Sequence, residues 1–170
     1  MENIHILQYE AFVFRSSIEL CNKKTTDVIT KTFPIMNCKF ASLFLAFHYR
    51  TIWSDIEIIL VCGRGENMVT HAWLEVDGYA IDITGDQYNL LDSAILNEEV
   101  IRYRPYPKVH VEQISRSYLY SLFEYLDRLI LENDFSNIKK YFVKNMERSH
   151  ESLLDDLDVN RSKFKNNRLS

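Results

Sequence analysis

The amino-acid sequence predicts an α+β fold in which helices at both ends of the chain flank an antiparallel sheet. Apolar residues recur at helical spacings of three and four near the N-terminus and again after residue 114. Between these regions lie a short run rich in Ile and Val and an Asp-Gly pair flanked by two β-prone stretches. A length of 170 residues with 46% apolar residues suits one domain with a sizeable core.

The N-terminal region predicts an amphipathic helix followed by a polar loop over residues 22–32. The apolar positions of this helix are Ile4, Leu7, Ala11, Phe14, Ile18 and Cys21. Phe33 precedes a proline and therefore avoids the helical conformation, while Asn37 is a favourable N-cap. The run from Cys38 to Arg50 is apolar nearly all round, which predicts a helix buried at the centre of the domain.

The middle of the chain predicts a strand and a hairpin. Residues 56–62 form a continuous apolar run, and residues 69–76 alternate with period two. Asp77-Gly78 then separates the second run from residues 79–84, which is a strong hairpin signal. A two-residue loop pairs Leu74 with Ile81, so His71 and Asp82 become diagonal neighbours on one face, about 7–8 Å apart at the backbone.

The rest of the domain is predicted from weaker patterns. Residues 85–96 read as an irregular return, and residues 100–110, which hold two prolines, as an edge strand. Helical spacing predicts two further helices, over residues 114–130 and 136–158. We therefore expect a single domain over residues 1–158, with its core at about 33–110. Residues 159–170 are expected to form a basic, flexible tail, or alternatively a contact to an acidic partner.

Composition excludes several classes of protein. A net charge of −4 argues against a nucleic-acid-coating protein, so no nucleic-acid partner is expected. Cys21, Cys38 and Cys62 are odd in number and widely spaced, which predicts neither a disulfide framework nor a metal site. The chain lacks phosphate-binding and dinucleotide motifs, so no cofactor is expected. It also lacks an apolar stretch of about 18 residues and a signal-peptide pattern, and we expect a cytoplasmic location without a membrane span.

Three residues suggest nucleophilic catalysis. Cys38 is expected in the first turn of its helix, where the helix dipole and free N–H groups favour a thiolate. His71 is then the candidate base, and Asp82 the residue that orients the imidazole. The alternative is a structural thiol beside a solvent-facing His and Asp.

A family resemblance supports the catalytic interpretation. The segments FPIMNCKFASLFLAF and HAWLEVDGYAIDITGDQYN resemble papain-like-fold bacterial proteins of the transglutaminase-like superfamily. The resemblance covers residues 33–89 and implies a papain-like core with a Cys38-His71-Asp82 triad. Met36 and Asn37 depart from it, since small residues or Gly are expected there.

The resemblance implies a cysteine-dependent amide hydrolase or acyl transferase that acts on a peptide or protein through a thioester. Hydrolysis is favoured over transfer, and the candidate substrate-binding residues are Gln87, Trp73 and Asn37. One alternative is a non-catalytic binding module with the same fold. Another is an interaction module built on a helix over residues 118–130.

Other reactive residue types are expected to be structural. Cys62 ends a buried strand and is expected in the core. The remaining histidines lack partners at meaningful spacing and are expected to be structural or exposed. They are His5, His48, His110 and His150.

Overall fold

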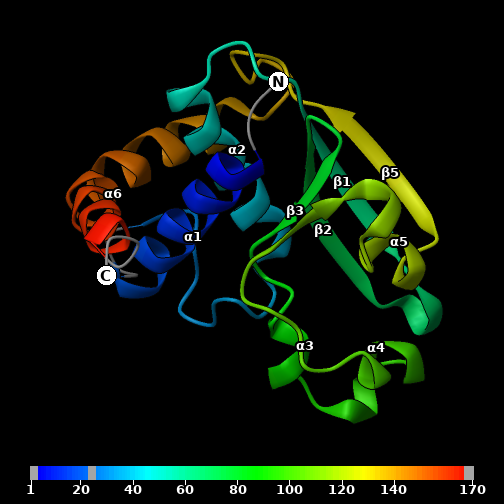
Figure 1. Cartoon of the computed structure of the whole chain (residues 1–170). Helices are drawn as coiled ribbons and strands as arrows, with labels where there is room; N and C mark the ends of the chain where they lie inside the picture. Colours follow the sequence, from blue (N-terminus) through cyan, green and yellow to red (C-terminus); the bar gives the residue numbers. More distant parts are fainter. Residues whose placement is uncertain (1–3, 23–25, 167–170) are drawn as a thin grey trace.

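The computed structural model describes residues 4–22 and 26–166 of the chain. A five-stranded antiparallel sheet is flanked by N- and C-terminal helices, which confirms the predicted α+β class (Figure 1). The helices are α1 (Ile4–Leu20), α2 (Cys38–Ile52), α3 (Gln87–Leu90), α4 (Glu98–Arg102), α5 (Leu119–Leu122) and α6 (Lys140–Asn166). The strands are β1 (Ile58–Arg64), β2 (Thr70–Val76), β3 (Tyr79–Asp82), β4 (His110–Gln113) and β5 (Tyr125–Ile130).

The sheet has the order β4-β3-β2-β1-β5. The hairpin of β2 and β3 has the predicted register, with Leu74 opposite Ile81 and a turn at Asp77-Gly78. Gly78 has a φ of +83°, which a two-residue hairpin turn favours. Strand β1 continues to Arg64 and pairs with β2, so that Gly63 lies opposite His71.

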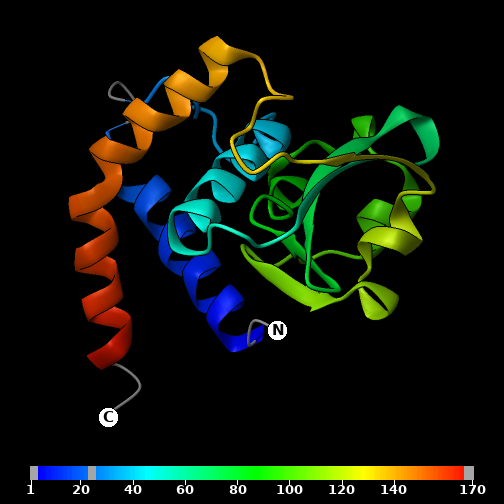
Figure 2. The ribbon, with the colours of Figure 1, turned by 90° about the horizontal axis from the view of Figure 1, so that it is seen from above.

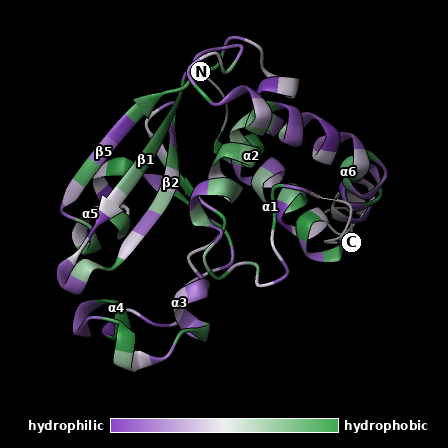
Figure 3. Ribbon diagram, turned by 180° about the vertical axis from the view of Figure 1, so that it is seen from behind, coloured by the Kyte–Doolittle hydropathy of each residue, from purple (hydrophilic) through white to green (hydrophobic). Residues whose placement is uncertain are grey.

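Helices α1, α2 and α6 form layers on one face of the sheet. Viewed from above, α6 is outermost, α1 lies inside it, and α2 lies against the sheet (Figure 2). Leu60, Leu74 and Ile81 face these helices and belong to the larger apolar core. Hydrophobic residues are prominent in α2, while hydrophilic residues recur along the outer helix α6 (Figure 3). The buried character predicted for the Cys38 helix is therefore observed on the side of α2 that packs inward.

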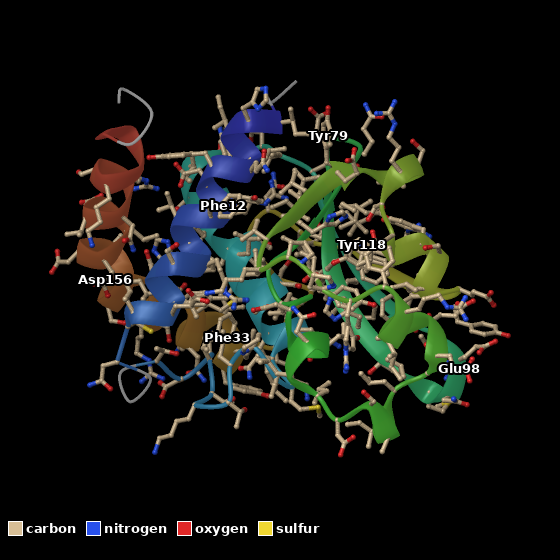
Figure 4. All side chains as sticks on the ribbon, turned by 60° about the horizontal axis from the view of Figure 1, so that its bottom comes forward. Phe12, Phe33, Tyr79, Glu98, Tyr118 and Asp156 are labelled. Atoms are coloured by element: carbon tan, nitrogen blue, oxygen red, sulfur yellow. The ribbon has the colours of Figure 1, made fainter. Side chains whose placement is uncertain are left out.

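The opposite face of the sheet is also buried. A second apolar cluster covers it and contains Trp73 of β2, Leu119 of α5 and Phe123. Tyr118 lies within this crowded group of side chains (Figure 4). The hairpin face that carries His71 and Asp82 is therefore enclosed rather than open to solvent, since both residues are at most 2% exposed.

The predicted helix over residues 114–130 is wrong. Only Leu119–Leu122 is α-helical, and Tyr125–Ile130 forms β5 instead. Strand β5 pairs antiparallel with β1, and these long-range hydrogen bonds override the helical spacing of the local apolar residues. The alternative of an interaction module on a helix over residues 118–130 is therefore not supported, because that helix is not formed.

The ends of other elements also differ from the sequence prediction. The expected return over residues 85–96 contains α3, and the edge strand is His110–Gln113, following α4. The C-terminal helix runs from Lys140 to Asn166, so the predicted tail is helical up to residue 166. Arg161 in this segment donates a hydrogen bond to Glu10 of α1 at 2.9 Å, which holds it against the domain. The last predicted tail residues, 167–170, lie outside the described residues.

None of the helices in the described ranges combines the length and the apolar composition that crossing a bilayer requires.

Candidate active site

Cys38 is the first residue of α2, as predicted. Its sulfur lies close enough to His71 for that side chain to lower the pKa of the thiol, and the backbone N–H of Lys39 acts in the same direction. One turn further, the hydroxyl of Ser42 donates to the carbonyl oxygen of Ala72 at 3.2 Å, which ties α2 to the strand residue beside His71. The start of α2 is therefore held against the end of β2 that carries the histidine.

The turn before Cys38 is fixed by Asn37. Its side chain does not cap α2 and is fully buried. The Asn37 oxygen accepts the backbone N–H of Thr30 at 2.9 Å, and its nitrogen donates to the carbonyl of Ile35 at 2.7 Å. Met36 has a φ of 59°, a left-handed conformation that favours glycine. The side chain of Asn37 therefore holds the turn before Cys38 in place through hydrogen bonds to Thr30 and Ile35. It does not line the pocket beside Cys38.

His71 and Asp82 are in direct contact. The Nε2 atom of His71 lies 2.8 Å from the Oδ2 atom of Asp82, and both side chains are enclosed. The Oδ1 atom of Asp82 accepts the backbone N–H of Thr84 at 2.8 Å and its hydroxyl at 3.1 Å. The Tyr118 hydroxyl approaches Oδ2 at 3.5 Å. Asp82 is therefore held in one orientation, and its hydrogen bond engages the Nε2 atom of His71.

The contacts shift the pKa values of all three residues. Burial alone would raise the pKa of Cys38, but the hydrogen bond and charge of His71 lower it below its ordinary value. Burial would lower the pKa of His71, but the charge and hydrogen bond of Asp82, with Cys38, raise it to about 10. Burial opposes ionisation of Asp82 as well, yet the charge of His71 and the bonds from Thr84 keep its pKa low. The arrangement favours a thiolate–imidazolium pair beside a carboxylate.

Gln87 lies between the cysteine turn and the histidine. Its Nε2 atom is 3.1 Å from Nδ1 of His71, and its Oε1 atom accepts the backbone N–H of Met36 at 3.4 Å. The side chain is 4% exposed. When Nδ1 carries a proton it becomes a donor to the thiolate, and the Gln87 amide is released to donate elsewhere near Cys38.

A salt bridge between Arg15 of α1 and Asp86 lies next to the segments that carry Gln87 and Cys38. Arg15 donates to the two carboxylate oxygens of Asp86 at 2.9 and 2.8 Å, and also to the carbonyl of Ile83. The same guanidinium lies 4.4 Å from the ring centroid of Phe33, which precedes the cysteine turn. Arg15 therefore connects the chain just before Gln87 to the segment that leads to Cys38.

An open pocket of about 560 Å³ gives access to Cys38 and His71. It lies over the strand ends, between the start of α2 and strands β1, β2 and β5. Its lining residues are Cys38, Lys39, Cys62, Gly63, Arg64, Thr70, His71, Ala72, Tyr125, Leu126 and Asp127. A larger pocket of about 770 Å³ lies at the other end of the sheet, between Trp53 and Gly78, and contains none of the triad residues. The smaller pocket is the candidate active site because Cys38 and His71 line it.

The pocket lining differs from the predicted substrate-binding set. Trp73 is fully buried, with its ring 6.2 Å from that of His71 and its Nε1 donating to Tyr120. None of Trp73, Asn37 and Gln87 is among the residues that line the pocket. The residues from β5 were missed because that segment was predicted as a helix, and only its pairing with β1 brings them to the site.

The remaining cysteines and histidines are placed as follows. Cys62 is half-buried and lines the pocket, so it is not the enclosed core residue that its strand predicted. His48 and His150 do have partners: their ring nitrogens are 3.0 Å apart, and His48 lies 3.1 Å from Glu10. These contacts join α1, α2 and α6, so both histidines are structural. His110 contacts the hydroxyl of Ser117 at 2.9 Å.

Comparisons of this chain with protein-family models, with curated proteins and with solved structures found no match.

Proposed function

We propose that this protein is a cysteine-dependent amide hydrolase or acyl transferase with a papain-like, transglutaminase-like core. The observation that carries the proposal is that Cys38 and His71 line one open pocket, with Asp82 2.8 Å behind His71. A buried structural thiol would have a raised pKa, whereas the pKa of Cys38 is lowered.

The reaction divides into two halves. In the first, the Cys38 thiolate attacks the carbonyl carbon of the substrate amide, and the bond to nitrogen breaks. The His71 imidazolium gives its proton to the departing amine, which leaves the acyl group on sulfur as a thioester. In the second, neutral His71 takes a proton from water as the water attacks the thioester, and the carboxylic acid and the thiol are released.

The supporting residues have distinct roles in this mechanism. Asp82 holds His71 through Nε2 and stabilises its positive charge. Backbone N–H groups at the start of α2, where a helix lacks its own carbonyl partners, are the main-chain donors that we assign to the oxygen of the tetrahedral intermediate. The amide of Gln87, released when Nδ1 is protonated, is the side-chain donor that we assign to the same oxygen.

We favour hydrolysis over transfer of the acyl group to an amine, because none of the elements in the described part of the chain suggests a second-substrate site. Incubation in water labelled with heavy oxygen, with and without a primary amine, separates the two. Label in the released carboxylate supports a hydrolase, and efficient amine incorporation with little label supports a transferase.

Limited alkylation tests the identity of the nucleophile. We expect limiting iodoacetamide at neutral pH to modify Cys38 before Cys21 and Cys62, as read by peptide mass spectrometry. Earlier modification of either other cysteine in the folded protein would contradict the proposal. It would favour a non-catalytic binding module instead.

A further inference from the structure

Two basic side chains face the pocket beside the nucleophile. Lys39 follows Cys38 in the first turn of α2, and Arg64 ends β1. Both are exposed. Within the described ranges, neither makes an ion pair or a side-chain hydrogen bond. Their charges are therefore available to a ligand in the pocket.

Arg64 differs in this respect from four other arginines in the described part of the chain. Ion pairs to carboxylates engage Arg15, Arg128, Arg148 and Arg161. The Arg64 guanidinium instead lies 5.5 Å from the ring centroid of Tyr125, which also lines the pocket. Stacking on an aromatic ring limits the positions of the guanidinium without neutralising it, so the group is partly preorganised for an anion.

The balance of charge in the pocket is positive although the whole chain carries −4. Asp127 of β5 is the one acidic side chain in the lining, against Lys39 and Arg64. Burial raises the pKa of Cys62, another residue of the pocket lining, above its ordinary value. The positive charge of Lys39 acts on the same thiol in the opposite direction. An anionic group is therefore favoured at this site over a neutral one of the same shape.

We propose that Lys39 and Arg64 are specificity residues that bind a carboxylate of the acyl donor. The preferred substrate is then a peptide that carries an Asp or Glu side chain next to the scissile amide. This inference rests on the proposed function of Cys38 as the nucleophile. An ammonium group in the same position would meet two positive charges, so peptides with Lys or Arg there are disfavoured.

The charge of two matched alkylating reagents tests the inference without knowledge of the substrate. Iodoacetate and iodoacetamide deliver the same carbon to sulfur, but only the first is an anion. The quantity measured is the rate constant for iodoacetate divided by the rate constant for iodoacetamide, both at Cys38. This ratio is compared in the wild type, in Arg64→Gln and in Lys39→Gln. We expect each substitution to lower the ratio by about two- to fivefold, the effect of one exposed charge pair. The difference should shrink at about 1 M salt, where the screening length falls to about 3 Å.

Two controls separate charge from other effects. Arg64→Lys retains the positive charge and is expected to retain most of the ratio. Arg116→Gln removes an exposed arginine beyond β4, at the other edge of the sheet, and should leave the ratio unchanged. Peptide pairs that differ only in Glu or Gln next to the scissile amide provide the second readout. The wild type should have a higher kcat/KM for the Glu peptide, and this preference should fall in Arg64→Gln and Lys39→Gln.

The outcomes distinguish this inference from the function on which it rests. If Cys38 is alkylated first but the ratio is the same in the wild type, Arg64→Gln and Lys39→Gln, the carboxylate site is wrong and the nucleophile stands. If Cys38 is not the most reactive cysteine with either reagent, the proposed function itself fails.

Discussion

The Nε2 atom of His71 lies 2.8 Å from the Oδ2 atom of Asp82, and Gln87 contacts the other ring nitrogen at 3.1 Å. Both nitrogens of a fully buried imidazole are thus engaged, and the same imidazole lowers the pKa of Cys38. The hydrogen bond to Asp82 sets the orientation of the ring. The consequences of this arrangement can be tested residue by residue.

Asp82→Asn should preserve the fold and lower turnover by about 10²–10⁴-fold, because an amide neither stabilises the imidazolium nor fixes its tautomer. Glu75→Gln is the matched control. Glu75 lies on the same face of β2, but its carboxylate accepts from Tyr120 and Arg128 instead. Circular dichroism checks folding and kcat checks the role. Full activity in Asp82→Asn with none in His71→Ala would make Gln87 the next candidate for the orienting residue.

The rate of alkylation at Cys38 should depend on pH in a way that His71 controls. The pKa of Cys38 is lowered and that of His71 is raised to about 10, so the thiolate–imidazolium pair persists between the two apparent values. We expect a reactive thiolate below the pH at which a free thiol ionises. In His71→Ala, burial raises the pKa of Cys38 without compensation, and the profile should move to higher pH. An unchanged profile in that variant would exclude the ion pair.

Gly85→Ala should impair catalysis without removing a reacting group. A Cβ atom at Gly85 would lie 2.7 Å from Oδ2 of Asp82 and 2.7 Å from the Tyr118 hydroxyl, so the carboxylate must shift away from His71. Gly78→Ala is the control, because nothing lies within 4 Å of its added Cβ. Its positive φ should cost about 1–2 kcal/mol of stability while kcat is retained. Equal kcat values in the two variants would contradict the positional role of Asp82.

Acid should destabilise the fold through His150. Burial, then the positive charges of His48 and Arg161, lower the pKa of His150 to about 4, and the carboxylate of Glu10 lies across the same cluster. In the unfolded chain the value is about 6.5, so between these values the unfolded state binds the proton and stability falls as pH falls. The loss from about pH 7 to about pH 5 should be about 1–2 kcal/mol, with solvent at the cluster edge screening part of it.

Urea unfolding of the wild type and of His150→Gln measures this effect. The raised pKa of His71 gives an opposite trend, with stability lost as pH rises above about 6.5, but it is common to both proteins. The difference between their pH slopes therefore reports His150. Identical slopes would show that His150 is not held neutral by its surroundings.

The sequence predicted the parts of the site that depend on local patterns. The Asp77-Gly78 turn fixed the hairpin register, and this register alone placed His71 near Asp82. The Phe33-Pro34 pair and the apolar run after Asn37 located the start of α2. These features are determined by residues close together in the chain, so they could be read without a structure.

The pocket could not be predicted in the same way. Leu122, Leu126 and Ile130 have spacings that also suit a helix, and only the free edge of β1 selects a strand there. Arg15 and Asp86 are separated by 71 positions in the sequence, and His48 and His150 by 102 positions. The local sequence carries no signal for contacts over such separations. The left-handed conformation of Met36 could not be predicted either, because the sequence has no glycine at that turn to indicate it.

Formation of an acyl-enzyme on Cys38 tests the central claim most directly. The protein is mixed with p-nitrophenyl acetate, a generic acyl donor, quenched in acid and mapped by peptide mass spectrometry, with Cys38→Ser and His71→Ala in parallel. We expect an acetyl group on Cys38 that forms quickly in the wild type, forms far more slowly in His71→Ala and is absent from Cys38→Ser. Acetylation of Cys62 or Cys21 ahead of Cys38, or equal rates at Cys38 in the wild type and His71→Ala, would contradict it.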